Sequence, residues 1–160
     1  MRRSDRRVTK PLHFDDVCRD LDRRRDRVLA ELHVTLATRV RQIESMTGGR
    51  FAPYCGYRGE KEQNEAKAAG HSRAVWGESP HNFTPALACD LVLDPRVVAV
   101  GEIDGWPNLW DIVSPEAVQA WAMLEAAATT VGLARVTLSH ARRDYPHVEL
   151  PGWRALVKPS

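Results

Sequence analysis

Residues 87–93, LACDLVL, are apolar at every position except Asp90, and this pattern predicts a buried β-strand. A carboxylate in such a strand needs a partner, because burying an unpaired charge is costly. The preceding stretch SPHNFTPA, residues 79–86, places His81 in a loop that leads into the strand. The predicted strand and the loop before it therefore contain an Asp and a His, residue types that can serve in catalysis or metal binding.

Helical patterns lie on both sides of this strand. Residues 13–45 repeat apolar side chains at spacings of three, four and seven, which predicts one long helix or two shorter ones, ended by residues 46–49. The sequence Ser-Pro-Glu at residues 114–116 is typical of a helix start, and Gly132 is typical of a helix end. We therefore expect a further helix between these two signals.

Short strands complete the predicted fold. We expect strands at residues 51–57, 135–139 and 147–150, a short helix at 60–69, a loop at 95–110 and a polar connection at 141–146. Helices and strands are only partly segregated, and no regular strand-helix-strand repeat is present. The predicted fold class is therefore α+β, a single domain with an antiparallel sheet flanked by helices.

The composition is that of an ordinary globular domain. The chain has 160 residues, of which 43% are hydrophobic and 28% charged, and these values exclude collagen-like and low-complexity chains. The three cysteines are an odd number at wide spacings, so they predict neither a disulfide framework nor a Cys-x-x-Cys metal clip. We expect free, mostly buried thiols.

Charge is distributed unevenly along the chain. The formal net charge is +2, but residues 1–50 hold 13 Arg and Lys against 8 Asp and Glu, a balance of +5. No long apolar run follows the basic start, so we predict no signal peptide and no transmembrane segment, and we expect a cytosolic protein. The expected organisation is a basic arm at residues 1–12 and a domain at 13–160, with a helical segment at 13–46 and a catalytic core at 50–152.

A second polar segment follows near the C-terminal end. Residues 144–150, DYPHVEL, place Asp144 three positions before His147 at the entrance of a predicted strand. A catalytic zinc needs three nitrogen or oxygen ligands and one open position, which His, Asp and His from neighbouring strands can supply. For each residue taken alone, a buried His or a capping Asp with a purely structural role remains an alternative.

Several short motifs occur in a fixed order along the middle of the chain. They are CGYR (55–58), EQ (62–63), GHS (70–72), GESPHN (77–82), PALACDL (85–91), and Asp144 with PHVEL (146–150). Together they resemble the zinc D-alanyl-D-alanine carboxypeptidase and L-alanyl-D-glutamate endopeptidase family, in particular its phage endolysin branch. The family has six residues between the first His and the Asp, whereas eight separate His81 from Asp90, so we expect a loop extension around Thr84 and Pro85.

The resemblance implies a role for each matching residue. His81, Asp90 and His147 correspond to zinc ligands, and Asp144 corresponds to the general base. Zinc lowers the pKa of its bound water to about 7, and a nearby carboxylate can take the proton of that water. Arg58 is then the group that stabilises the oxyanion.

Three further residues receive supporting roles. Ser79 would fix the loop that bears His81, and Gln63 would contact a ligand residue or the substrate. Glu149 stands two residues after His147, hence on the same strand face, where it would orient a ligand or bind substrate.

Alternatives remain open at several of these positions. Arg58 could instead pair at the surface with Glu60 or Glu62. His71 and His140 lie near the motifs and are rival ligands, whereas His13 and His33 lie in the basic helical region and are expected to be solvated.

The resemblance implies hydrolysis of an amide in the peptide stem of bacterial peptidoglycan, with Zn²⁺ as cofactor and lysis of the host cell as the result. The endolysin branch cleaves between L-alanine and D-glutamate, and the alternative is removal of a terminal D-alanine by the carboxypeptidase branch. Such a lysin stays in the host cytoplasm until a holin opens the membrane. The basic N-terminus would attach to anionic lipids or wall polymers, or would be a solvated helix face.

Two other classes of function compete with this reading. The Arg-rich start could bind nucleic acid through phosphate contacts, but Asp15, Asp16, Asp20, Asp22 and Asp26 interleave with the arginines, so we expect no nucleic-acid partner. A non-catalytic module that only binds the wall is the other alternative. The presence of Asp144 argues against it, because a pure binding site needs no base.

Overall fold

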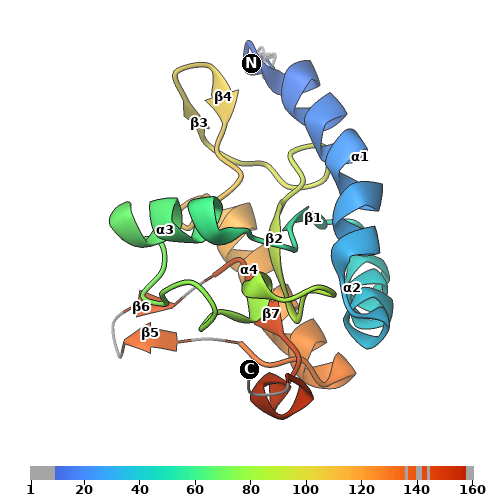
Figure 1. Ribbon diagram of the computed structural model, residues 1–160. Coiled ribbons are helices and arrows are strands. Elements are labelled where there is room, and N and C mark those ends of the chain that lie inside the picture. The colour runs from blue at the N-terminus through green and yellow to red at the C-terminus, as the bar shows by residue number, and fades with distance from the viewer. Residues whose placement is uncertain (1–9, 136, 140–141, 144, 158–160) are drawn as a thin grey trace, which may run out of the picture.

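A three-stranded antiparallel sheet in the order β1-β2-β7 lies at the centre of the molecule (Figure 1). Its strands are β1 (Phe51–Cys55), β2 (Ala88–Leu93) and β7 (His147–Glu149). The computed structural model describes residues 10–135, 137–139, 142–143 and 145–157. The predicted strand around Asp90 is confirmed, and the structure places it in the middle of the sheet.

Four α-helices surround the sheet in the described part of the chain. They are α1 (Phe14–Glu31), α2 (Val34–Met46), α3 (Glu60–Ala68) and α4 (Pro115–Val131), with 3-10 helices η1 (Pro80–Asn82) and η2 (Trp153–Leu156). In Figure 1, α1 lies at the right of the sheet and α3 at the left. The α+β class, the single domain and the antiparallel sheet agree with the sequence prediction.

The long helical region is two helices, the second of the two predicted alternatives. The break lies at Leu32 and His33, where the backbone becomes extended and the His33 Nδ1 accepts a hydrogen bond from the Thr35 amide. The same break pairs with the segment before β2, because the His33 amide donates to the Ala86 carbonyl at 2.9 Å. His33 is therefore a half-buried helix cap, which corrects the expectation that it is solvated.

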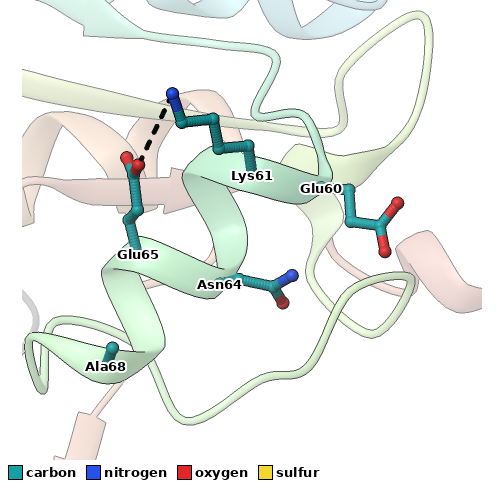
Figure 2. Close-up of a pocket in the computed structure, with 5 residues that line it drawn as sticks. All are labelled: Glu60, Lys61, Asn64, Glu65 and Ala68. Carbon is teal, nitrogen blue, oxygen red and sulfur yellow. Dashed lines mark ion pairs between the residues drawn. The ribbon is translucent and has the colours of Figure 1, made fainter.

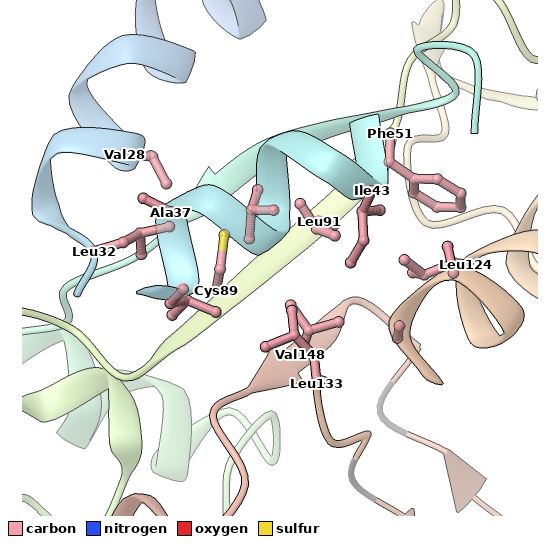
Figure 3. Close-up of a cluster of buried hydrophobic side chains, with 14 of the residues drawn as sticks. Val28, Leu32, Ala37, Ile43, Phe51, Cys89, Leu91, Leu124, Leu133 and Val148 are labelled. Carbon is pink, nitrogen blue, oxygen red and sulfur yellow. The ribbon is translucent and has the colours of Figure 1, made fainter. Parts of the chain in front are cut away.

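The core lies on one face of the sheet, against α2 and α4 (Figure 3). Side chains alternate between the two faces of a strand, so Cys89, Leu91 and Leu93 of β2 all point into this core. Val148 of β7 joins them there. Asp90 lies between Cys89 and Leu91 in the chain, so it points to the opposite face of the sheet.

Two segments differ from the sequence prediction. The expected loop at 95–110 contains a hairpin of β3 (Glu102–Ile103) and β4 (Trp106–Pro107), because Asp104 and Gly105 both adopt positive φ, as a tight hairpin turn requires. The expected connection at 141–146 contains β6 (Arg142–Arg143), which pairs with β5 (Thr137–Ser139) in a separate sheet. Among the described residues, Ala134 bridges to Glu149 of β7, whereas β5 lies in the separate sheet with β6. The expectation that the strand at 135–139 joins the same sheet as the strand at 147–150 is therefore wrong.

The structure also bears on the predictions made for the cysteines and for membrane-spanning helices. Cys18, Cys55 and Cys89 are free, as expected, but Cys55 is only half-buried. Among the described helices, none combines the length and the apolar character needed to span a bilayer. Most of the predicted basic arm lies outside the described residues, so its boundary with the domain stays a prediction.

Asp111 stabilises the turn that leads into α4. Its carboxylate accepts hydrogen bonds from the Gly101, Val113 and Ser114 amides and from the Ser114 hydroxyl. Burial opposes ionisation, but these bonds prevail and hold the pKa of Asp111 well below its ordinary value of 3.8. The turn therefore depends on an ionised Asp111.

We expect Asp111→Asn to lower the free energy of unfolding at pH 7 by about 1–3 kcal/mol, because buried donors lose their acceptor. Since the folded-state pKa is depressed, this contribution is present above pH 3.8 and is lost as the pH falls through the folded value. Urea unfolding at pH 7 and pH 2 measures it, with the exposed Asp104→Asn as control. An equal difference between wild type and variant at both pH values would contradict the assignment.

Candidate active site

Three side chains form a row across the sheet on the face opposite the main core. Asp90 of β2 is paired in register with Cys55 of β1 on one side and with His147 of β7 on the other. Directly opposed residues in an antiparallel sheet point to the same face. The sheet thus assembles a thiol, a carboxylate and an imidazole from residues far apart in the chain.

His81 reaches this row from the 3-10 helix η1. The Ser79 hydroxyl accepts a hydrogen bond from the His81 amide, and the Asn82 Oδ1 accepts one from the Ser79 amide; the two bonds close the start of the short helix. This is the contact that the predicted loop-fixing role of Ser79 requires. The two extra residues between His81 and Asp90 are accommodated in the loop after η1, and His81 still lies beside Asp90.

The imidazole of His81 is buried, with 2% of the residue exposed, and its orientation is fixed by the backbone. Its Nδ1 lies 2.7 Å from the Gly56 carbonyl oxygen. A carbonyl oxygen can only accept, so Nδ1 carries the proton and Nε2 is left with a lone pair. That Nε2 faces the Asp90 Oδ1 at 3.3 Å.

His147 is oriented by Glu149, and its nitrogen that faces Asp90 is also left with a lone pair. Its Nε2 lies 2.7 Å from the Glu149 Oε2, so the proton on Nε2 is donated to the carboxylate. The unprotonated Nδ1 faces the Asp90 Oδ1 at 3.5 Å and the His81 Nε2 at 3.3 Å. Three lone-pair atoms therefore converge without a proton of their own between them.

The spacing of these three atoms fits a metal ion. Ligand atoms about 2.0–2.1 Å from a tetrahedral zinc lie about 3.4 Å from one another. The observed separations among His81 Nε2, His147 Nδ1 and Asp90 Oδ1 are 3.3, 3.3 and 3.5 Å. Cys55, His81 and Asp90 also form a group whose ligand atoms lie within 4.8 Å of one another, so this side of the sheet can hold a metal ion.

The second oxygen of Asp90 is held by Arg58. The Arg58 Nη2 donates to the Asp90 Oδ2 at 3.3 Å, which leaves Oδ1 facing the two histidines. Arg58 therefore pairs with Asp90 rather than with Glu60 or Glu62.

Gln63 connects Arg58 with the loop that bears His81. The side chain is fully buried; its Oε1 accepts from Arg58 at 3.2 Å and from Asn82 at 3.1 Å, while its Nε2 donates to the Ser72 hydroxyl and the Ala74 carbonyl. The side-chain amide of Gln63 thus makes four hydrogen bonds. One side chain of α3 therefore connects the arginine, the loop of His81 and the segment after α3.

We expect Gln63→Ala to lower the free energy of unfolding by about 2–4 kcal/mol, because it leaves buried donors on Arg58 and Asn82 without their acceptor. Asn64→Ala is the matched control, since Asn64 is the next residue of the same helix but is exposed. Chemical denaturation of both variants measures the difference. A cost for Gln63→Ala no greater than for Asn64→Ala would show that the network is not stabilising.

The other predicted residues lie elsewhere or outside the described part. His71 is exposed after the end of α3, away from the converging atoms. His13 stacks on Trp106 with ring centroids 4.0 Å apart and is half-buried, which corrects its expected solvation. Asp144, the predicted base, and His140, the rival ligand, lie outside the described residues.

A surface hollow lies along the outer side of α3 (Figure 2). It is lined by Glu60, Lys61, Asn64, Glu65 and Ala68, and it has a volume of about 710 Å³. An ion pair between Lys61 and Glu65, 3.9 Å apart, crosses part of it. None of the three converging ligand atoms lines this hollow, so the candidate site is defined by its side-chain chemistry and not by this depression.

Sequence reasoning missed two residues of the cluster. Cys55 was expected to be an ordinary buried thiol, although it directly precedes the Gly-Tyr-Arg motif that carries Arg58. The sequence motif gives Asn82 no separate role, yet its amide donates to both the Gln63 side chain and the Arg58 carbonyl. Their adjacency to Arg58 and His81 in the sequence was the available signal.

Comparison with known proteins supports the fold. No protein-family model matches the chain, and no curated protein matches it significantly. Among solved structures, the fold is that of a bacterial endopeptidase. One solved structure with this fold is the L-Ala D-Glu endopeptidase ChiX of Serratia marcescens, with a TM-score of 0.57 and 21% sequence identity over 83% of this chain and 90% of that one. At this identity the likeness establishes a shared fold.

Proposed function

We propose that this protein is a zinc-dependent peptidoglycan hydrolase in which His81, Asp90 and His147 hold the metal. The observation that carries the proposal is the convergence of three lone-pair atoms 3.3–3.5 Å apart, each held in place by a second partner. Such an arrangement is repulsive without a cation and favourable with one. Two imidazoles and one carboxylate leave a fourth position open, as a catalytic zinc requires.

We further propose that the bond cleaved is the amide between L-alanine and D-glutamate. Two independent facts support this choice: the ordered motifs that resemble the endolysin branch, and the fold shared with an L-Ala D-Glu endopeptidase. In this proposal the protein lyses the host of a phage, remaining in the cytoplasm until a holin gives access to the wall. Removal of a terminal D-alanine is the alternative that the same motifs allow.

The residues of the chain divide the chemistry between them. Bound zinc supplies a Lewis acid that makes water acidic enough to attack at neutral pH. Asp144 takes the proton of the attacking water and passes it to the leaving amine. The Arg58 guanidinium has five N–H donors, of which two bond to Gln63 and Asp90, and the proposal assigns the remaining side of the fork to the oxyanion.

The metal ligands are held in place by their own partners. Glu149 orients His147, the Gly56 carbonyl orients His81, and Arg58 orients Asp90. Partners of this kind fix the direction of each lone pair before the metal arrives. Site assembly therefore costs little side-chain entropy when the metal binds.

The test is turnover on purified peptidoglycan with and without a chelator, followed by mass spectrometry of the released ends. New amino groups on D-glutamate are expected, and the chelator should abolish them until zinc is restored. Release of free D-alanine would instead assign the carboxypeptidase activity. Undiminished digestion in the presence of chelator would overturn the metal-dependent mechanism.

The basic start of the chain is proposed to attach the enzyme to anionic lipids or wall polymers. Its support is the charge balance of the first fifty residues, 13 basic against 8 acidic. We expect deletion of residues 1–12 to weaken sedimentation of the protein with cell walls at low salt but not at high salt. Equal binding by both forms at low salt would remove the charge-attachment role.

A further inference from the structure

Cys55 stands at the end of β1, directly opposite Asp90. Its position there depends on an irregularity in the strand. Pro53 pairs with Leu91, so a regular ladder would place Tyr54 opposite Asp90, but the register shifts by one residue between Pro53 and Cys55. Bulges of this kind redirect a side chain to the other face of a sheet. Here the bulge turns a thiol toward the candidate metal site.

The thiol lies close enough to act as a ligand. The sulfur, a ligand nitrogen of His81 and a carboxylate oxygen of Asp90 all lie within 4.8 Å of one another. The thiol is half-buried and adjoins the Arg58 guanidinium, whose charge favours a thiolate, although burial raises the pKa of Cys55 to about 11 in the metal-free protein. Rotation about the Cα–Cβ bond moves the sulfur without moving the backbone, and binding requires a rotamer that shortens these separations.

We infer that Cys55 is a fourth protein donor of the metal site, which thereby binds thiophilic divalent cations through two nitrogens, one oxygen and one sulfur. The inference rests on the proposed metal site of His81, Asp90 and His147. It adds a ligand of a different chemical class to that site.

Binding of a metal ion by Cys55 releases the proton of the thiol. The metal–sulfur bond forms as the S–H bond breaks, and the proton leaves to solvent or buffer. A thiolate is a soft ligand, so it favours Zn²⁺, Cd²⁺ and Co²⁺ over Mg²⁺ and Mn²⁺, whereas a site with only nitrogen and oxygen donors discriminates less. Because zinc can expand to five donors, a sulfur ligand is compatible with hydrolysis at the same ion.

The consequence is a difference in metal preference that one side chain controls. Cys55→Ser keeps nearly the same size and replaces sulfur with a harder oxygen. We expect the affinity for Cd²⁺ to fall by about tenfold or more in this variant, while the affinity for Mn²⁺ changes much less. Cys18→Ala is the matched control, because it removes another free thiol that lies on α1.

The deciding experiment is optical absorption of the full-length protein titrated with Co²⁺, with bound metal measured by equilibrium dialysis. Wild type and Cys18→Ala are expected to show a near-ultraviolet thiolate-to-cobalt charge-transfer band, which Cys55→Ser lacks while still binding one Co²⁺. Co²⁺ binding by wild type without that band would overturn the role of Cys55 and leave the proposed hydrolase intact. No Co²⁺ binding by wild type would overturn the metal site itself. The wild-type spectrum decides the question even if Cys55→Ser does not fold.

Discussion

Replacement of His81 by alanine is expected to abolish both metal binding and peptidoglycan hydrolysis. The His81 Nε2 is one of three converging lone-pair atoms, and its imidazole is buried, so no water-exposed group can take its place. A catalytic metal contributes several kcal/mol to the transition state, and each 1.36 kcal/mol is a factor of ten. We therefore expect hydrolysis to fall by about a thousandfold or more, measured on purified peptidoglycan together with bound zinc.

The control for this variant is His71→Ala. His71 lies near the same motifs but is exposed after α3, so its loss is expected to leave zinc content and turnover unchanged. A melting curve of His81→Ala separates loss of the metal from loss of the fold. If His81→Ala retained a full equivalent of zinc, or if His71→Ala lost it, the ligand assignment would have to be changed.

The fold was predictable wherever local pattern and burial agree. The apolar run at residues 87–93 forms the central strand because both of its faces are covered, one by the main core and the other by a second apolar cluster around Val92 together with the candidate site. The apolar repeat predicts the helical region but does not decide between one helix and two, so it does not locate the break at Leu32 and His33. That break depends on backbone pairing with Ala86, a contact distant in sequence.

The candidate site was predictable from the sequence only in part. The sequence motifs identified His81, Asp90 and His147 as one group, and the structure brings these three side chains together. The place of Cys55 was not predictable, because strand alternation would have directed it to the other face. A one-residue bulge, which leaves no sequence signature here, reverses that direction.

Substitution of Asp144 by asparagine is expected to stop hydrolysis while leaving the metal in place. In the proposed mechanism Asp144 accepts the proton of the attacking water, and an amide of the same size cannot do so. General-base catalysis contributes typically 10²–10⁴-fold, so we expect turnover to fall by about that factor. Zinc content should equal that of the wild type, because His81, Asp90 and His147 are untouched. Turnover at saturating zinc and metal analysis of the same sample measure both quantities.

Glu149→Gln provides the contrasting variant, since Glu149 lies two residues beyond His147 while Asp144 lies three residues before it. The Glu149 carboxylate accepts the proton of the His147 Nε2 and thereby directs Nδ1 at the metal position. Loss of such a partner typically weakens metal affinity by about 10–100-fold, and excess zinc restores the site. The roles of the two carboxylates can therefore be distinguished: Glu149→Gln is expected to recover turnover as the zinc concentration is raised, and Asp144→Asn is not. Recovery of Asp144→Asn by zinc would mean that Asp144 serves the metal and that the base is another group.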